Sequence, residues 1–418
     1  MNQRETGSVK GKAKQRGRPF PLPREGVKEG FESDSWVRTV QSLVRSSFTK
    51  NRSLRLFKGG QAAYEALFEA IGGARDLVAL EFYIFRDDQT GWALGDLLQR
   101  KAREGVKVYL IYDHFGCRGT ASRLWRTLSQ AGVQVRAFHP PSWISPAQYL
   151  HRDHRKLVII DGRQAFTGGV NIGDEYRGYF RKKLTGWRDT AACIKGPIAA
   201  SMLNFFEQSW RECDREATAG ARLLPDLSIP SSEDRGELSL IPLFSASRAS
   251  MKALQRLLHL SILTARKSIH ITVAYFIPPR RIVQLLCAAA RRGVDVKLIL
   301  PGESDLKLTS VASRAFYPTL LREGVQLYHY RSGILHAKTM LFDGCWAILG
   351  SANLDARSFS YNYESGIGIL DREVGHQMEE MFREDLESSV PVTREEIEQY
   401  PFWERLAGSM LLRFRSYL

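Results

Sequence analysis

Apolar and polar positions along the chain follow strand-like and helix-like patterns, and the same succession occurs twice. Residues 75–85 and 106–113 are apolar runs rich in β-branched and aromatic residues, separated by a helical pattern that ends at a glycine. Residues 268–276 and 294–300 repeat this arrangement in the later half of the chain. In both halves basic residues precede the glycine, as is typical of helix C-termini. The pattern therefore indicates a duplicated unit.

The repeat is too long for a solenoid and indicates a duplicated domain. Residues 131–135 (AGVQV) and 323–327 (EGVQL) match as a third pair. Because strand–helix–strand units connect parallel strands, we expect a largely parallel sheet in each half. The predicted fold class is α/β, with two similar mixed-sheet lobes packed as a pseudo-two-fold pair.

Composition divides the chain into four parts. Residues 1–34 are rich in Lys, Arg, Gly and Pro and predict a disordered basic arm, which either binds an anionic surface or is simply solvated. Residues 35–213 form the predicted first lobe. The polar, Pro-containing stretch 214–237 reads as a linker, and residues 238–418 form the second lobe.

Charge and cysteine content narrow the classes of protein. The 418 residues include 60 Lys+Arg and 45 Asp+Glu, a net charge of +15 that favours an anionic partner such as nucleic acid, an acidic membrane or a phosphorylated substrate. Five scattered cysteines argue against a disulfide framework or a zinc site and favour a reducing compartment. No apolar stretch is long enough for a transmembrane helix, so we expect any membrane contact to be peripheral.

Each half contains one motif of the form H-x-K-x4-D, followed by G-G/S-x-N. The first motif begins at His154 and Lys156 and ends at Asn171, and the second begins at His336 and Lys338 and ends at Asn353. Residues two positions apart on a strand point to the same face. Each motif therefore places an imidazole beside an ammonium group.

Such a pair suits chemistry at a phosphodiester. Lys and Asn donors can hold the anionic oxygens, and a histidine can attack phosphorus or protonate a leaving oxygen. One copy supplies only one histidine role, so we expect both copies to share one active site and to react through a phosphohistidine. The two lysines would replace the charge of a metal ion, and we expect no metal and no cofactor. His151 and His154 could form a metal pair, but no third ligand is evident.

Acidic residues open the strand that follows each motif. We predict that Asp189 orients His154 and that Glu364 orients His336, although either acid could be a surface charge. Asp161 and Asp343 precede glycines at strand ends and are read as turn or cap residues. Asp113 also ends a strand and is either a site-edge residue or a turn former.

These motifs resemble the duplicated signature of the phospholipase D superfamily. The segments 154–176, 187–190 and 335–359 are similar to bacterial cardiolipin synthases, as are residues 275–278 and 304–305. The resemblance implies transfer of a phosphatidyl group from one phosphatidylglycerol to a second, which yields cardiolipin and glycerol. It also implies that the first-half histidine is the nucleophile and the second-half histidine the general acid.

The expected partner is anionic phospholipid, chiefly phosphatidylglycerol, at the cytoplasmic face of the bacterial inner membrane, and no nucleic acid is expected. Residues 138–146 and the amphipathic segment 402–415 are candidate membrane contacts, unless the latter packs on the core. Three alternatives stay open: a phospholipase D-type hydrolase, a nuclease of the same superfamily, and a non-catalytic lipid-binding scaffold.

Overall fold

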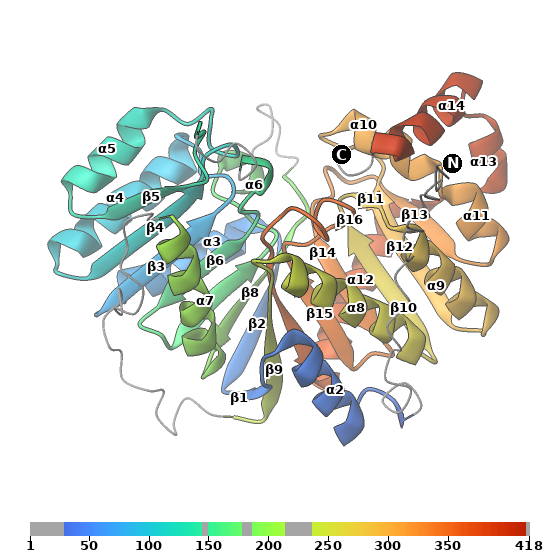
Figure 1. Cartoon of the computed structure of the whole chain (residues 1–418), viewed down its shortest axis with the longest axis horizontal. Coiled ribbons are helices and arrows are strands. Elements are labelled where there is room, and N and C mark those ends of the chain that lie inside the picture. The colour runs from blue at the N-terminus through green and yellow to red at the C-terminus, as the bar shows by residue number, and fades with distance from the viewer. Residues whose placement is uncertain (1–28, 144–148, 178–185, 214–235, 415–418) are drawn as a thin grey trace, which may run out of the picture.

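Two β-sheets, one mainly from each half of the chain, stand side by side with helices on both faces (Figure 1). The computed structural model describes residues 29–143, 149–177, 186–213 and 236–414. Most of the predicted basic arm and most of the predicted linker lie outside these residues. Every helix in the described ranges is too short or too polar to span a bilayer.

The first sheet has seven strands and contains both parallel and antiparallel neighbours. Its parallel part joins β3, β4 and β5, and the other neighbours are antiparallel. The strands in spatial order are β2 (Ser53–Lys58), β8 (Thr190–Lys195), β7 (Gln164–Gly168), β6 (Lys156–Ile160), β3 (Leu77–Phe82), β4 (Lys107–Asp113) and β5 (Gln134–Phe138).

The second sheet has nine strands and repeats this arrangement, with its parallel part in β10, β12 and β13. A separate two-stranded sheet pairs β11 (Phe276–Ile277) with β16 (Leu354–Asp355). The nine strands in spatial order are β1 (Thr49–Asn51), β9 (Leu238–Phe244), β17 (Ser365–Leu370), β15 (Trp346–Gly350), β14 (Lys338–Phe342), β10 (Ser268–Val273), β12 (Asp295–Pro301), β13 (Gln326–Tyr330) and β18 (Ser389–Pro391).

The α/β prediction with mixed sheets is confirmed, but the expectation of largely parallel sheets is wrong. The reason lies in the turns after the motif strands. Asp161 and Gly162 have φ of 50° and 64°, and Asp343 and Gly344 have φ of 51° and 67°. Two successive residues with positive φ form the tight turn that connects antiparallel strands. Each motif strand is therefore the first strand of a hairpin.

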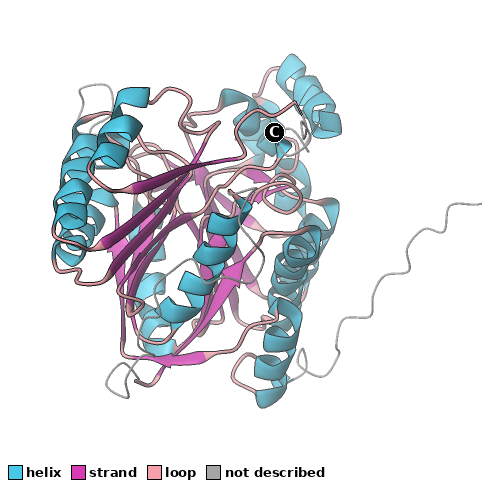
Figure 2. Ribbon diagram, turned by 60° about the vertical axis from the view of Figure 1, so that its left-hand side comes forward, coloured by secondary structure: helices cyan, strands magenta, loops and turns pink. Residues whose placement is uncertain are grey.

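Helices cover the outer faces of both sheets and also fill the space between them (Figure 2). On the first sheet the outer helices are α3 (Gly60–Gly72), α4 (Gln89–Arg103) and α5 (Ser122–Gln130). On the second sheet they include α2 (Asp34–Val44), α8 (Arg248–Thr264), α9 (Arg280–Arg291), α10 (Lys307–Arg314) and α11 (Tyr317–Arg322). The remaining helices are α6 (Asp174–Arg177), α7 (Ile198–Glu212), α12 (Arg372–Glu387), α13 (Arg394–Glu398), α14 (Phe402–Leu411) and the 3₁₀ turn η3 (Leu412–Phe414).

A central apolar core joins the two lobes. It contains the inward side chains of both sheets together with buried residues of α7 and α12, such as Phe206, Trp210 and Met378. Burial of such large side chains contributes roughly 1.5–3 kcal/mol each. The two lobes are therefore held together as one body around this core.

The first described segments pack on the second half of the chain. Trp36 of α2 is fully buried and its ring lies 5.7 Å from that of Trp346, and β1 pairs with β9. The next strand, β2, pairs with β8 of the first sheet. Sequence analysis assigned residues 35–51 to the first lobe, whereas the structure places them against the second sheet because the apolar stripe of α2 is buried there.

Candidate active site

Each H-x-K motif lies where an irregular segment enters the strand that carries its lysine. Lys156 opens β6 and His154 precedes it, while Lys338 opens β14 and His336 precedes it. The four residues are buried, with exposures from 2% to 8%. The sequence prediction of two equivalent imidazole–ammonium pairs therefore corresponds to two buried pairs at equivalent places in the lobes.

Backbone hydrogen bonds connect each motif to the opposite lobe. The amide of His154 donates to the carbonyl of Tyr363 at 2.9 Å, and the amide of Tyr363 donates to Arg152 at 2.8 Å. Equivalently, the amide of His336 donates to Arg188, whose amide donates to the carbonyl at position 334, both at 2.8 Å. The matching pattern relates the two lobes by a pseudo-two-fold axis that passes between the motifs.

These bridges decide which acid faces which histidine. Nδ1 of His154 lies 3.0 Å from Oε2 of Glu364, and Nδ1 of His336 lies 2.6 Å from Oδ2 of Asp189. Our prediction of the opposite pairing is wrong, because each acid directly follows the residue that bridges to the other lobe's motif. Neither acid is a surface charge, since both are 1% exposed.

The crossed pairs define which imidazole nitrogen can react. A carboxylate on Nδ1 fixes the ring orientation and favours the tautomer that carries its proton on Nδ1. Nε2 then holds a free lone pair, and in the described part of the chain Nε2 of neither His154 nor His336 has a protein hydrogen-bond partner. Each lobe therefore supplies the carboxylate that orients the histidine of the other lobe, and Nε2 of each histidine is available to react.

Burial changes the protonation of the lysines. Removal from water lowers the pKa of Lys156 to about 7, and Glu364 partly opposes this effect. Burial likewise lowers the pKa of Lys338 to about 8, partly opposed by Asp189. Lys156 also feels the charge of Lys338, so the two motifs share one electrostatic environment. An anionic ligand between them would restore the charged form of both.

The same burial keeps the histidines neutral. Burial, reinforced by the charge of Lys156 and partly opposed by Glu364, lowers the pKa of His154 to about 4. Burial and Lys338 also lower the pKa of His336. For Asp189 and Glu364, burial by itself would raise the pKa, but the neighbouring cations hold both below their ordinary values. The site therefore combines neutral imidazoles with ionised carboxylates, as a nucleophilic histidine requires.

The asparagines that end the two motifs, Asn171 and Asn353, each accept a hydrogen bond from a backbone amide. Oδ1 of Asn171 accepts from the amide of Ile84 at 3.1 Å, and Oδ1 of Asn353 accepts from Tyr275 at 3.3 Å. The Asn171 amide also donates to the hydroxyl of Tyr176 at 2.7 Å. These bonds tie the motif loops to the segments that follow β3 and β10. The use of the remaining N–H groups on a phosphate stays a prediction.

Comparison with known proteins agrees with this geometry. The family model described as "Cardiolipin synthase, PLD-like domain" matches residues 67–210 and 258–386, more than half of the chain. The cardiolipin synthase A of Pseudomonas putida KT2440 is 36% identical over 368 residues, 87% of this chain and 75% of that protein. The protein of the same name from Pseudomonas fluorescens SBW25 is 35% identical over 361 residues, 86% of this chain and 74% of that protein.

The chain belongs to the phospholipase D-like cardiolipin synthase family. Solved structures show the same fold. Phosphatidylserine synthase from Haemophilus influenzae superposes with a TM-score of 0.71 at 17% identity, over 91% of this chain and 99% of that one. Polyphosphate kinase from Porphyromonas gingivalis gives 0.54 at 12% identity, over 96% of this chain and 59% of that one.

The aspartates that end the family motif have a structural role. The carboxylate of Asp161 accepts from the amides of residues 75–77 at 2.8–3.0 Å, and Asp343 accepts from residues 266–268 at 2.8–3.1 Å. This confirms the turn and cap interpretation. Asp113 fits both alternatives: it accepts from the amides of Phe115 and Gly116 as a turn former, and its Oδ2 accepts from the amide of Asp153, next to His154, at 2.9 Å.

Sequence reasoning missed why the family motif carries G-G in one half and G-S in the other. A Cβ atom at Gly169 would collide with the Asp189 carboxylate, so only glycine leaves room for that acid. At the equivalent position Ser351 instead donates to Oε2 of Glu364 at 2.5 Å. The alternation of glycine and serine in the two motifs was the available signal.

Aromatic rings around the histidines were also missed as site residues. The ring of Tyr83 lies 4.9 Å from that of His154. The rings of Trp187 and Tyr176 lie 5.1 and 5.6 Å from that of His336. Trp187 comes from the first lobe, immediately before the bridge residue Arg188. Each imidazole is therefore bounded by rigid walls that are not equivalent in the two lobes.

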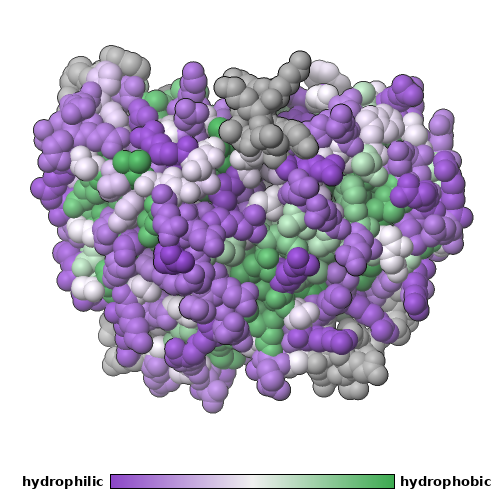
Figure 3. Space-filling model, turned by 180° about the vertical axis from the view of Figure 1, so that it is seen from behind, coloured by the Kyte–Doolittle hydropathy of each residue, from purple (hydrophilic) through white to green (hydrophobic). Residues whose placement is uncertain are grey.

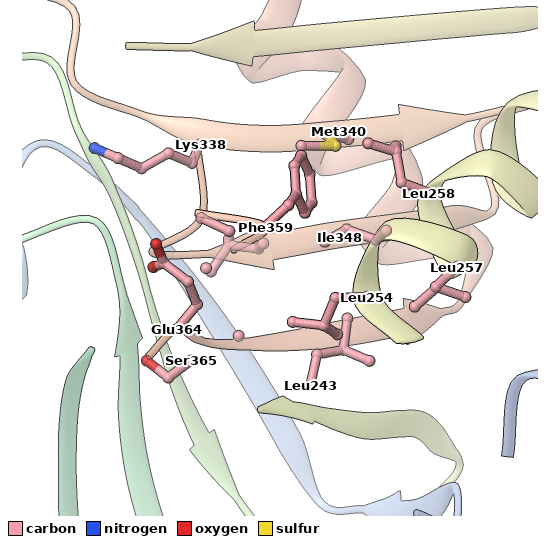
Figure 4. Close-up of a pocket in the computed structure, with 14 residues that line it drawn as sticks. Leu243, Leu254, Leu257, Leu258, Lys338, Met340, Ile348, Phe359, Glu364 and Ser365 are labelled. Atoms are coloured by element: carbon pink, nitrogen blue, oxygen red, sulfur yellow. The ribbon is translucent and has the colours of Figure 1, made fainter. Parts of the chain in front are cut away.

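A pocket lined mainly by apolar side chains lies beside the lysine of each motif. In the second lobe, apolar side chains of α8 and the sheet line a pocket that reaches Lys338 and Glu364, whose charged ends point away from the apolar part (Figure 4). In the first lobe, α3 and the sheet line a corresponding pocket that reaches Lys156. Within the described residues, no group of three or more His, Cys, Asp or Glu side chains is arranged to hold a metal ion.

Proposed function

We propose that this protein is a phosphatidyltransferase that forms cardiolipin from two phosphatidylglycerol molecules and releases glycerol. The observation that carries the proposal is the pair of crossed contacts, His154 with Glu364 and His336 with Asp189. Two histidines of opposite lobes, each with Nε2 free and a lysine beside it, supply both a nucleophile and a proton donor. Relatives named cardiolipin synthase A support the choice of lipid.

In the first step, Nε2 of His154 forms a bond to the phosphorus of one phosphatidylglycerol. The bond between phosphorus and the glycerol oxygen breaks, and protonated His336 gives its proton to that oxygen. The bound anion raises the pKa of His336 and so favours this protonated form. The products are glycerol, a phosphatidyl group on His154 and a neutral His336.

In the second step, His336 accepts the proton of a glycerol hydroxyl of the second phosphatidylglycerol. The hydroxyl oxygen bonds to phosphorus, and the bond to Nε2 of His154 breaks. Cardiolipin leaves, His154 is neutral and His336 is protonated again. Lys156 and Lys338, together with amide groups of Asn171 and Asn353, are proposed to hold the non-bridging oxygens through charge-assisted hydrogen bonds.

The test is the lipid product. Purified protein is incubated with phosphatidylglycerol in mixed vesicles, and the lipids are identified by mass spectrometry. We expect cardiolipin and equimolar glycerol, and we expect His154→Ala to abolish both. Phosphatidic acid as the main product would contradict the proposal and indicate a hydrolase. Cleavage of DNA without lipid turnover would indicate a nuclease.

We also propose peripheral attachment to an anionic membrane beside the site. Trp143 is fully exposed and Leu150 is 51% exposed, and both precede His154 closely. Leu306 and Leu308 are 49% and 60% exposed at the start of α10, in the other lobe. Exposed apolar side chains suit insertion at a bilayer interface. Figure 3 shows one face of the molecule, which is largely hydrophilic at its margins and has an apolar area across its centre.

Of the two candidate membrane segments, α14 packs on the protein. Glu404 pairs with Arg314 of α10, a Cβ at Gly408 would lie 2.8 Å from the Val311 carbonyl, and Met410 is 58% exposed. Most of the basic arm lies outside the described residues, and its role stays a prediction. Attachment is tested by sedimentation with vesicles containing phosphatidylglycerol. Trp143→Ser is expected to weaken binding at least several-fold, whereas Val390→Ser, which removes an exposed valine elsewhere, is the matched control.

A further inference from the structure

The two halves of the site have equivalent backbones but different side chains at their rims. Arg152, two residues before His154, is 1% exposed; its Nη1 pairs with Oδ1 of the buried Asp113 at 3.9 Å, and its guanidinium lies 4.1 Å from the ring centre of Tyr149. The equivalent position before His336 is Ile334. The rim beside His154 therefore carries a guanidinium, paired with Asp113, that the rim beside His336 lacks.

The His336 rim instead combines aromatic rings with a carboxylate. Tyr176, Trp187 and Tyr275 place their rings 5.1–6.4 Å from the imidazole of His336. The hydroxyl of Tyr275 donates to Oδ2 of Asp305 at 2.7 Å, which fixes the carboxylate at this rim. Asp305 is exposed, and its Oδ1 accepts a hydrogen bond from the hydroxyl of Ser304 at 3.3 Å, which leaves further lone pairs for a ligand.

The negative charge of Asp305 affects the pKa of both His336 and Lys338. Burial and Lys338 lower the pKa of His336, and the negative charge of Asp305 is among the groups that raise it. For Lys338, burial again lowers the pKa, and Asp189 and Asp305 oppose it. Asp305 therefore acts on the same space as His336, from a loop between β12 and α10 that carries no motif residue.

Aromatic faces beside a fixed carboxylate are suited to a polyol. Ring faces pack against the C–H surface of a polyol, and a carboxylate accepts hydrogen bonds from its hydroxyl groups. At the opposite rim, Arg152 is ion-paired with Asp113, but its Nη1 and Nη2 make no hydrogen bond and can donate to an anion. This arrangement separates the two ends of a phosphatidylglycerol headgroup, with phosphate toward His154 and glycerol toward His336.

We propose that Asp305, fixed by Tyr275 and flanked by the aromatic rings around His336, binds the glycerol headgroup that leaves and the one that attacks. The proposal rests on the proposed function and deepens it, because it names the group that selects a glycerol-bearing acceptor over water. Asp305 accepts hydrogen bonds from the glycerol hydroxyls that do not react. Tyr275 is a positioning residue that holds the carboxylate in place.

The experiment measures how the phosphatidyl-enzyme divides between two acceptors. Phosphatidyl-p-nitrophenol serves as donor, since its leaving group has no glycerol, and labelled glycerol is added at increasing concentration. Transfer to glycerol yields labelled phosphatidylglycerol, and transfer to water yields phosphatidic acid. Both products come from one intermediate, so their ratio reports acceptor selection and cancels differences in the amount of folded enzyme.

Asp305→Asn is expected to lower the ratio of phosphatidylglycerol to phosphatidic acid roughly tenfold at a fixed glycerol concentration, the loss of about one charge-assisted hydrogen bond. Tyr275→Phe is expected to lower the ratio less. The matched control is Glu303→Gln, which removes an exposed carboxylate from the same loop and should leave the ratio at the wild-type value.

An unchanged ratio in Asp305→Asn, or an equal fall in Glu303→Gln, would overturn the inference. A fall in both products without a change in their ratio would also overturn it, because that result shows an effect of charge on His336 instead of acceptor binding. A wild-type protein that forms no phosphatidylglycerol at any glycerol concentration would contradict the proposed function itself, which separates the two failures.

Discussion

His154 and His336 each have a carboxylate at Nδ1. Substitution of these two acids can therefore distinguish the catalytic roles of the two histidines. Glu364 serves His154 and Asp189 serves His336. If His154 is the nucleophile, loss of Glu364 should slow formation of the phosphatidyl-enzyme. Loss of Asp189 should instead slow the proton transfers at the other histidine.

We therefore expect Glu364→Gln and Asp189→Asn to fail at different steps. With phosphatidyl-p-nitrophenol, whose leaving group needs no acid, Glu364→Gln should reduce the burst of nitrophenol by roughly 10²-fold. Asp189→Asn should retain the burst and accumulate phosphatidyl-His154, detectable by mass spectrometry after rapid quenching. The reverse pattern, or label on His336, would exchange the roles of the two histidines.

The buried histidine also makes stability depend on pH. The pKa of His154 is about 4 in the folded protein, against the ordinary value of 6.5. Between these values the unfolded chain binds a proton that the folded chain does not, so the free energy of unfolding falls as pH falls from 6.5 to 4. The contribution of this residue is on the order of 3 kcal/mol.

His154→Gln removes that group, so its melting temperature should fall less between pH 7 and pH 4.5 than that of the wild type. Calorimetry or circular dichroism measures the two differences. His376→Gln, at an exposed position on α12, should behave like the wild type. A steeper loss of stability in His154→Gln would contradict the assignment of a neutral, buried imidazole.

At the scale of the elements, the close approach of β7 and β8 decides whether Asp189 can reach His336. Gly169 follows β7, and its amide donates to the carbonyl of Thr190 at 2.9 Å. A methyl group at this position would occupy the place of the Asp189 carboxylate. Displacement of that carboxylate separates it from His336 without changing either histidine–lysine pair.

Gly169→Ala should therefore reduce cardiolipin formation about 100-fold and destabilise the protein by about 1–3 kcal/mol, as overpacking does. Ser351→Ala, which deletes only a hydrogen bond to Glu364, should cost about tenfold in rate. Gly72→Ala at the end of α3, where an added Cβ meets nothing, is the control. Wild-type rates for Gly169→Ala would show that Asp189 is not held where the structure places it.

The elements that sequence predicted well are those with local signals. The motif strands, the helix ends at glycine and the turn role of Asp161 depend on neighbouring residues, and the structure confirms them. The pairing of each acid with the histidine of the other lobe could not be predicted from local signals. Asp189 and His336 lie 147 positions apart and meet only because the lobes pack face to face. The assignment of α2 to the first lobe was wrong for the same reason, since Trp36 of α2 packs against Trp346 in the other half of the chain.

For the whole molecule, both halves of the site come from one chain. The parallel bridges between Asp153 and Tyr363, and between Arg188 and Leu335, connect the lobes directly at the motifs. Arg188 further pairs with Asp385 of α12, with its Nη2 2.6 Å from the carboxylate. The central apolar core lies behind these contacts. A chain that lacks one histidine should therefore have no means of borrowing it from another chain.

Mixtures of His154→Ala and His336→Ala proteins test this consequence directly. If each chain closes its own site, the co-expressed or mixed variants should form no more cardiolipin than the sum of the two alone, which we expect to be at least 10³-fold below wild type. Wild-type protein mixed with either variant should show activity proportional to its own amount. Recovery of a substantial fraction of wild-type activity would mean that lobes of different chains can pair, and the crossed contacts would then form between molecules as readily as within one.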